Sequence, residues 1–335
     1  MIEKACVIGG GSWGTALAAT IAKRGIDVTL WARDRSAVDA INAEHENARY
    51  LPGVALPESL VASADLATSI AGCGLILFVV PSGAMRSMAE QVAAIGVAPG
   101  TILVNCTKGI ERNTGLRMSE VIGEALPDSP CAVLSGPNHA EEVARELATA
   151  AVIGCEDGDV AVRLQEVFTL PWFRTYTSDD VAGIEIGSAV KNVFAIAAGI
   201  CDGLGLGDNA KAALVTRGLA EMVRIGKATG GKQETFQGLS GVGDLIVTCY
   251  STHSRNNRVG RLLGEGMSLE KVESEMNMVA EGVANSVSLY ECVKKLGIEA
   301  PIIEQAYRVI HDDKPPAQAL SELLSRDPRP EVDEA

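Results

Sequence analysis

Short apolar runs alternate with helical stretches over the first half of the chain. Each apolar run ends near Gly, Pro or Ser, and in the stretch that follows apolar residues recur every three to four positions. Strands that are apolar throughout, separated by helices, are typical of a parallel sheet covered on both faces. The predicted strands are residues 6–8, 27–32, 75–80, 101–104 and 131–134, and the first predicted helix is residues 14–23.

The pattern becomes wholly helical after about residue 180. Glycine-rich breaks separate the helical stretches, and no apolar run of comparable quality follows Tyr176. We therefore expect a mostly parallel α/β domain over residues 1–180, an all-α domain over residues 181–325 and a flexible polar tail over residues 326–335. The predicted helices of the second part are residues 182–198, 209–229, 285–296 and 301–311.

Composition and charge exclude several classes of function. The 335 residues include 29 Lys and Arg against 43 Asp and Glu, a net charge of −14, which argues against binding to nucleic acid. The longest nearly uncharged run, residues 186–201, is too short for a membrane span and carries Lys191, so we expect a buried core helix. The first residues lead directly into a predicted strand, so no secretory segment is expected.

Cysteine usage points to a reducing compartment. Eight scattered cysteines include no C-x-x-C pair, and only four histidines accompany them. We expect reduced thiols, a cytoplasmic location, no disulfide framework and no metal site.

A glycine turn between the first strand and the first helix predicts a dinucleotide site. Gly9, Gly11 and Gly14 form G-x-G-x-x-G, in which the glycines permit a tight turn, close approach of a pyrophosphate and close helix–strand packing. The helix N-terminus adds free N–H groups for phosphate oxygens. This context predicts a Rossmann-type fold. Arg33, at the end of the second strand, favours NADP(H) through a 2′-phosphate, while the adjacent Asp34 leaves NAD(H) possible.

Two lysines and one aspartate are candidates for catalytic or ligand-binding residues. Lys191 stands alone in a helix of small apolar residues, where burial lowers the pKa of an amine and suits it to proton transfer. Asp244 is either a helix N-cap or the carboxylate partner of Lys191. Lys108, beyond the strand at residues 101–104, is either a ligand contact or a surface lysine.

A cluster of donors predicts an anion site in the helical half. Ser254, Arg255 and Asn256 offer a hydroxyl, a guanidinium and an amide that suit the oxygens of a phosphate. The cluster is also consistent with a helix start capped by Ser254. No carboxylate partner is evident for His139, which argues against its use as a catalytic base.

These motifs, in this order, resemble the bacterial NAD(P)-dependent glycerol-3-phosphate dehydrogenase family over nearly the whole chain. Members interconvert dihydroxyacetone phosphate and sn-glycerol 3-phosphate for glycerophospholipid synthesis. Where this chain has Asn138 and His139, some members have Thr and an aromatic residue. The matching stretches are residues 9–17 (GGGSWGTAL), 105–110 (NCTKGI), 134–137 (LSGP), 189–193 (AVKNV), 209–214 (NAKAAL), 241–245 (GVGDL) and 254–256 (SRN).

The resemblance implies roles for individual residues, a cytoplasmic homodimer, a phosphorylated triose substrate and no metal. Lys191 would be the catalytic acid and base. The implied cofactor contacts, together with the glycine turn, are Ser12, Trp13, Arg33, Tyr50, Lys108, Ala140, Arg255, Val279 and Glu281. The implied substrate contacts are Lys108, Gly136, Asn138, Lys191, Asp244, Ser254, Arg255 and Asn256.

Two alternatives remain open from the residues. A small hydroxy-acid dehydrogenase would share the two-domain layout but would not need the donor cluster at residues 254–256. A non-catalytic dinucleotide-binding sensor would leave a buried Lys191 without a purpose.

Overall fold

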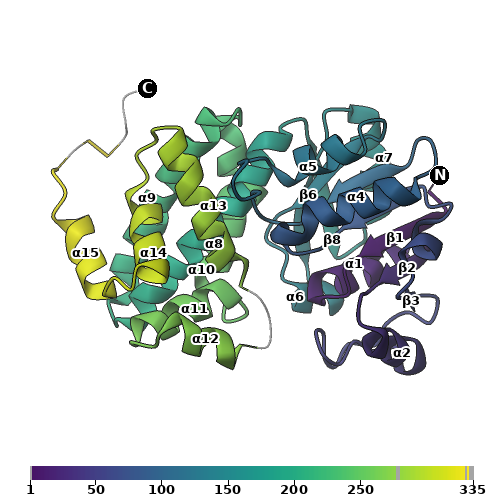
Figure 1. The fold of residues 1–335 in the computed structure, drawn as a ribbon, viewed down its shortest axis with the longest axis horizontal. Helices are drawn as coiled ribbons and strands as arrows, with labels where there is room; N and C mark the ends of the chain where they lie inside the picture. Colours follow the sequence, from purple (N-terminus) through teal and green to yellow (C-terminus); the bar gives the residue numbers. More distant parts are fainter. Residues whose placement is uncertain (1, 277–279, 329, 332–335) are drawn as a thin grey trace.

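The computed structural model describes residues 2–276, 280–328, 330 and 331. It has two parts side by side, an α/β part that contains the N-terminus and a helical part that contains the C-terminus (Figure 1). The Rossmann-type α/β fold followed by helices, predicted from the sequence, is confirmed.

An eight-stranded sheet forms the centre of the α/β part, in the order β3-β2-β1-β4-β5-β6-β7-β8. Neighbouring strands are parallel except β6 and β7. Ile8, the last residue of β1, is in register with Trp31 of β2 and Phe78 of β4, so three strands end at one edge. The chain reverses its direction of progress across the sheet between β1 and β4, the place where such sheets bind ligands. The strands are β1 Lys4–Ile8, β2 Asp27–Trp31, β3 Val61–Ser63, β4 Leu75–Phe78, β5 Ile102–Asn105, β6 Cys131–Ser135, β7 Thr149–Gly154 and β8 Phe173–Ser178.

Helices cover both faces of this sheet because its strands are apolar on both sides. In β1, Ala5 and Val7 belong to one buried cluster, which α1 and α7 complete, whereas Cys6 and Ile8 belong to another, which α4 and α5 complete. The two clusters make the sheet a continuous core. The helices of this part are α1 Ser12–Ala22, α2 Arg35–Glu44, α3 Leu66–Ile70, α4 Met85–Ile95, α5 Met118–Ala125, α6 Ala140–Ala144 and α7 Gly158–Phe168, with a short 3₁₀ turn, η1 Ser82–Ala84.

The helical part is built around α8, Val181–Gly203, which packs against α9, α10, α11, α13 and α14 and also reaches β6 and β7. This helix is long and apolar enough to cross a membrane, but its most apolar window is completely buried inside the protein. It is therefore a core helix, as predicted from residues 186–201. Around it lie α9 Gly207–Ala228, α10 Asp244–Tyr250, α11 Arg255–Gly264, α12 Leu269–Glu275, α13 Glu281–Lys295, α14 Pro301–His311 and α15 Pro316–Leu324, with the short turns η2 Gln233–Gln237 and η3 Leu239–Gly243.

The expected domain boundary falls between the last strand and this core helix. β8 ends at Ser178 and α8 begins at Val181. In the expected tail, Arg326 forms an ion pair with Glu299, and the carbonyl of Glu331 accepts a hydrogen bond of 2.8 Å from Arg217. Residues 329 and 332–335 of that tail lie outside the described residues.

Candidate active site

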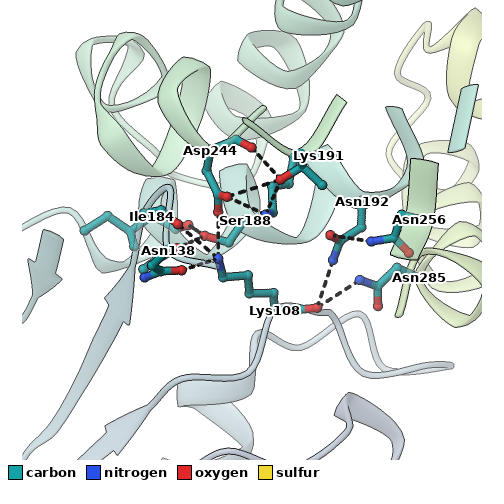
Figure 2. Close-up of polar contacts among 12 residues, drawn as sticks. Lys108, Asn138, Ile184, Ser188, Lys191, Asn192, Asp244, Asn256 and Asn285 are labelled. Carbon is teal, nitrogen blue, oxygen red and sulfur yellow. Dashed lines mark hydrogen bonds and ion pairs between the residues drawn. The ribbon is translucent and has the colours of Figure 1, made fainter. Parts of the chain in front are cut away.

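Three charged side chains meet where the two parts of the protein face each other (Figure 2). Lys191 Nζ on α8 donates to Asp244 Oδ1 at 2.5 Å, and Lys108 Nζ, just beyond β5, donates to Asp244 Oδ2 at 2.8 Å. Lys191 and Asp244 are buried, whereas the side chain of Lys108 retains 18% of its exposure. One carboxylate therefore bridges two ammonium groups, of which Lys191 is nearly buried and Lys108 is partly exposed.

Burial and charge set the protonation of this cluster. Burial, aided by the like charge of Lys108, lowers the pKa of Lys191 to about 7, although Asp244 opposes the shift. Burial alone would raise the pKa of Asp244, but the two lysines outweigh it and lower that pKa. Asp244 is therefore ionised at neutral pH, while Lys191 is near its titration midpoint, where a proton donor works best.

The local sequence brings Lys191 and Asp244 together. Gly187 lies one turn before Lys191, and a Cβ at Gly187 would stand only 2.8 Å from the carbonyl oxygen of Ser240. The glycine lets α8 approach η3, the π-helical turn that leads into Asp244, the first residue of α10. The N-cap interpretation of Asp244 is wrong, because Gly243 is the cap residue and Asp244 is the first residue of α10. The interpretation of Asp244 as the carboxylate partner of Lys191 is confirmed by their hydrogen bond.

Further polar residues hold this cluster, and two of them, Thr248 and Asn285, were not identified from the sequence. Thr248, one turn after Asp244 on α10, accepts from Lys191 Nζ at 2.7 Å. Asn285 Nδ2 on α13 donates to the backbone carbonyl of Lys108 at 2.9 Å, and Asn192 Nδ2 reaches the same oxygen at 3.5 Å. The spacing of Thr248 from Asp244 was a usable signal; Asn285 had none, because it lies 177 residues from its partner.

Near Lys108, two buried polar atoms of the described residues lack a hydrogen-bond partner. Lys108 Nζ also donates to the carbonyl of Gly136 at 3.1 Å and to Asn138 Oδ1 at 3.0 Å. Among the described residues, Asn138 Nδ2 and His139 Nε2 are buried and have no hydrogen-bond partner. Such orphaned groups suit a polar ligand that would complete their hydrogen bonds. Burial, followed by the charges of Lys191 and Lys108, lowers the pKa of His139, so its ring is neutral at pH 7.

The donor cluster at residues 254–256 forms the start of α11. Ser254 Oγ accepts from the N–H of Asn257 at 3.2 Å and so caps the helix, as one interpretation predicted. Arg255 is exposed at the first position of the helix. Asn256 is buried and ties α11 to its neighbours, since it donates to Asn192 at 3.0 Å and accepts from the N–H of Gly282 at 2.9 Å. A structural role is thus evident for Asn256 beside the predicted one.

The glycine turn fits a dinucleotide. A Cβ at Gly9, where φ is +131°, would lie 2.1 Å from the carbonyl oxygen of Val79, and a Cβ at Gly14 would lie 1.8 Å from that of Gly9. By contrast, a Cβ at Gly11 would meet nothing within 4 Å, so the turn is open on the side where a pyrophosphate would approach. Ser12 begins α1, and within the described structure the buried Trp13 Nε1 has no partner.

The end of β2 presents a free cation rather than a free carboxylate. Asp34 accepts from Ser36 N at 3.0 Å and from Arg49 at 3.2 Å, and its contacts with Ser36 lower its pKa. Arg33 is exposed and forms no hydrogen bond or ion pair within the described part of the chain. Asp34 is therefore occupied as the N-cap of α2, whereas Arg33 is available.

Asn47 holds the glycine turn in place, and it was not identified from the sequence. Its Nδ2 donates to the carbonyl of Gly10 at 2.9 Å and to Thr15 Oγ1 at 2.8 Å, and its Oδ1 accepts from Tyr50 N at 3.3 Å. The predicted cofactor residue Tyr50 is thereby held near the turn. No motif marks an asparagine 37 residues from its partner.

The remaining predicted cofactor residues lie on helix starts. Ala140 is the first residue of α6, which packs against α1. Glu281, the first residue of α13, accepts from Ser82 Oγ at 3.0 Å, and burial raises its pKa while Arg255 opposes the shift. Glu281 therefore joins the helical part to the end of β4. Val279 lies outside the described residues.

Comparison with known proteins identifies the family. The family model for the N-terminus of NAD-dependent glycerol-3-phosphate dehydrogenase matches residues 4–161, and the model for its C-terminus matches residues 180–321. The chain belongs to the NAD-dependent glycerol-3-phosphate dehydrogenase family. The resemblance that the ordered motifs suggested is confirmed.

Members of this glycerol-3-phosphate dehydrogenase family resemble the chain along its whole length. The glycerol-3-phosphate dehydrogenase (NAD(P)+) of Geobacter metallireducens is 48% identical over 334 residues, 99% of each chain. That of Carboxydothermus hydrogenoformans is 46% identical over 331 residues, 98% of each chain. The crystal structure of glycerol-3-phosphate dehydrogenase from Coxiella burnetii, 41% identical, superposes with a TM-score of 0.94 over 97% of this chain and 99% of that one.

A more distant likeness shows only that the fold is shared. A ketopantoate reductase family protein from Ralstonia eutropha is 17% identical, with a TM-score of 0.64 over 95% of this chain and 99% of that one. The two-part layout therefore does not itself identify a substrate, which has to be argued from the site.

Proposed function

We propose that the protein catalyses the reversible, NAD(P)H-dependent reduction of dihydroxyacetone phosphate to sn-glycerol 3-phosphate. The observation that carries this proposal is the buried Lys191–Asp244 pair beside the accessible Lys108. Membership of the dehydrogenase family supports it, since the relatives bear the name of that activity.

The three charged residues divide the chemistry of reduction. When bound, NAD(P)H would supply the hydride that the ketone carbon receives as it becomes an alcohol carbon. Negative charge then develops on the ketone oxygen, and Lys191 Nζ donates a proton to it. Lys108 Nζ stabilises the developing charge, and Asp244 keeps both ammonium groups aimed at one place. In the reverse direction neutral Lys191 accepts the hydroxyl proton.

The substrate phosphate is proposed to bind at the start of α11. Arg255 offers a guanidinium fork, Ser254 retains its hydroxyl proton, and the first turn of the helix adds N–H groups. Asn138 Nδ2, buried without a partner in the part of the chain that is described, is proposed to donate to the substrate beside Gly136. Asn256 has a second Nδ2 hydrogen for the same purpose, although its amide also holds α11 in place.

The cofactor site is proposed to run from the glycine turn to α13. Gly9, Gly11 and Gly14 would admit the pyrophosphate, and Arg33 would hold the 2′-phosphate of NADP(H). The other proposed contacts are Ser12, Trp13, Tyr50, Lys108, Ala140, Arg255, Val279 and Glu281. Relatives are named for both NAD and NADP, so both cofactors are supported.

The cellular setting belongs to the same proposal. We infer a cytoplasmic homodimer that supplies sn-glycerol 3-phosphate for glycerophospholipid synthesis, in which residues 1–180 bind the dinucleotide and residues 181–325 contribute most of the substrate site. Light scattering on the purified protein measures the oligomeric state directly, and a mass near 35 kDa would exclude the dimer.

Arg255 provides the test of substrate class. The wild-type protein should oxidise NADPH with dihydroxyacetone phosphate, followed by absorbance of the nicotinamide. Arg255→Ala should lower kcat/KM for this substrate at least about tenfold, because a charge-assisted contact is worth about 1.5–3 kcal/mol. At saturating NADPH, where the proposed cofactor contact of Arg255 no longer limits the rate, activity on unphosphorylated dihydroxyacetone should change little.

Three outcomes would contradict the proposal. No turnover with any ketone would favour a dinucleotide-binding sensor. A wild-type preference for a hydroxy acid would favour the other dehydrogenase class. Equal losses on both ketones in Arg255→Ala would assign Arg255 to the fold or to the cofactor instead of the phosphate.

A further inference from the structure

A buried carboxylate on α8 contacts the α/β part and is not used in the chemistry described above. Glu185 is 3% exposed. Its Oε1 accepts from Asn105 Nδ2 at 2.7 Å and from Ser119 N at 2.9 Å, and its Oε2 accepts from Ser119 Oγ at 2.5 Å and from Arg117 at 3.1 Å. All four donors come from the other half of the protein. A buried carboxylate with four donors is costly to assemble, which makes its purpose worth asking.

The contact with Asn105 leads to Lys108. Asn105 ends β5, and its side chain brackets one residue of the loop that follows, since Oδ1 accepts from Thr107 N at 2.8 Å and Nδ2 donates to Thr107 O at 3.2 Å. Thr107 Oγ1 in turn donates to the carbonyl of Val80 at 2.7 Å. Lys108 is the next residue. Glu185 thus holds Asn105, and Asn105 fixes the peptide from which Lys108 projects.

The same helix carries Lys191, six residues after Glu185 and about 9 Å further along the axis. Asn192, beside Lys191, donates to the backbone carbonyl of Lys108 at 3.5 Å, as Figure 2 shows. One helix therefore carries Lys191 and also contacts the segment before and at Lys108 twice, through Glu185 at Asn105 and through Asn192 at the carbonyl of Lys108.

We propose that Glu185 is a positioning residue that, through Asn105, fixes Lys108 relative to Lys191 for the reduction step. The inference rests on the function proposed above, since it concerns how that site is assembled. Arg117 neutralises the carboxylate in its buried place, and the Asn105 contact conveys its position to the loop.

The two oxygens of the Glu185 carboxylate have different partners, so variants that lose different contacts can be compared. Burial raises the pKa of Glu185, while the contacts with Ser119 and the charge of Arg117 oppose the shift. Glu185→Gln keeps an oxygen that can still accept from Asn105, while its amide nitrogen faces Ser119 Oγ, which can accept from it, and Arg117, which loses one acceptor but keeps Glu120. Glu185→Ala removes the link altogether. Ser119→Ala removes a donor from the same carboxylate but leaves the Asn105 contact untouched.

The experiment measures kcat and both KM values with dihydroxyacetone phosphate and NADPH, in the wild type and in a Lys108→Ala background. Glu185→Ala should lower kcat about tenfold or more, since small misplacements of a reacting group are costly, with KM for NADPH within about twofold. Glu185→Gln should restore kcat to within about threefold of wild type. Ser119→Ala should leave kcat within about twofold, although its melting temperature falls.

The Lys108→Ala background separates positioning from general damage. If Glu185 acts through Lys108, Glu185→Ala should lower kcat by less than about twofold there, because the group that it positions is already missing. Single-turnover mixing extends the measurement to this slow background. If Glu185→Ala does not fold, Asn105→Ala cuts the same link without stranding Arg117, and the same comparison applies to it.

Clear results would overturn the inference. Equal losses of kcat in both backgrounds would place the effect of Glu185 elsewhere. A lowered melting temperature with unchanged kcat would make the residue purely structural, and an equal loss in Ser119→Ala would mean that the whole network matters as a unit. Absence of turnover in the wild type would instead refute the proposed function, so the two failures are distinguishable.

Discussion

At the scale of single residues, the pKa of Lys191 decides the pH range of the reaction. Reduction needs Lys191 protonated, and burial lowers its pKa to about 7. In the complex with NADPH, kcat/KM for dihydroxyacetone phosphate should therefore fall about tenfold per pH unit above this value. Steady-state rates between pH 6 and 9 measure the slope, and a flat profile would contradict the role of Lys191.

Asp244→Asn is the control for that profile. The negative charge of Asp244 raises the pKa of Lys191 against the effect of burial. Its removal should shift the falling limb to lower pH and reduce kcat as well, because the amide holds the two lysines less firmly. If the pH at which kcat/KM falls were the same in Asp244→Asn as in the wild type, a group other than Lys191 would be responsible for the fall.

Arg33 governs the choice between cofactors at the same scale. Asp34 is engaged in capping α2, whereas Arg33 is exposed at the end of β2. Arg33→Ala should raise KM for NADPH by roughly ten- to a hundredfold, the equivalent of a contact worth about 1.5–3 kcal/mol, and should hardly affect KM for NADH. Equal changes for both cofactors would exclude a contact with the 2′-phosphate.

Residue chemistry predicted the centre of the site better than its surroundings. Lys191 was conspicuous because a charge inside the otherwise uncharged run of residues 186–201 is expensive to bury, and Asp244 followed as a potential partner. Glu185 stood in the same helix, yet its partners Asn105 and Ser119 lie 80 and 66 residues away and follow no local spacing. Such contacts depend on how helices and strands pack in three dimensions, so the spacing of residues along the sequence does not predict them.

At the scale of elements, close packing of α8 against α11 positions the start of α11. A Cβ at Gly260 of α11 would lie 1.9 Å from the carbonyl oxygen of Ile196, and a Cβ at Gly199 of α8 would lie 2.0 Å from that of Asn257. Backbone thus meets backbone along this contact. A side chain at either glycine would push α11, with Ser254 and Arg255, away from the lysine pair.

Gly260→Ala should consequently destabilise the protein by about 1–3 kcal/mol and lower kcat/KM for dihydroxyacetone phosphate. Denaturant unfolding and steady-state rates measure the two effects. Gly123→Ala is the matched control, since a Cβ there meets nothing within 4 Å on α5, and it should stabilise by about 0.5–1 kcal/mol. An unchanged kcat/KM in Gly260→Ala would mean that α11 can shift without harm.

Sequence patterns predicted five of the eight strands of the sheet. The apolar runs in β1, β2, β4, β5 and β6 were predicted, and so was the core helix α8. β3, with three residues at the sheet edge, β7, which begins with Thr149 and two alanines, and β8, whose residues alternate between buried and exposed, were not. Their sequences lack a long run of β-branched and large apolar residues, so pairing with neighbours defines them as strands.

At the scale of the whole molecule, α8 connects the two halves into one unit. Val181 and Ile184 pack against Val133 of β6 and Val152 of β7, while the rest of the helix forms the core of the helical part. The ion pair between Lys108 and Asp244 and the carboxylate of Glu185 cross the same boundary. Separation of the halves would expose apolar surface and break buried polar contacts together.

This coupling predicts that a ligand of one half protects the other. NADPH at about 100 times its Kd should add about 2.7 kcal/mol to the free energy of unfolding, which slows globally exchanging amides about a hundredfold. If the halves unfold together, hydrogen exchange should slow equally in β5 and in α14, although the proposed NADPH site involves no residue of α14. The short edge strand β3 should show little change, because it exchanges through local opening. Protection confined to the sheet would show that the helices unfold on their own and would leave α8 as a hinge between two independent domains.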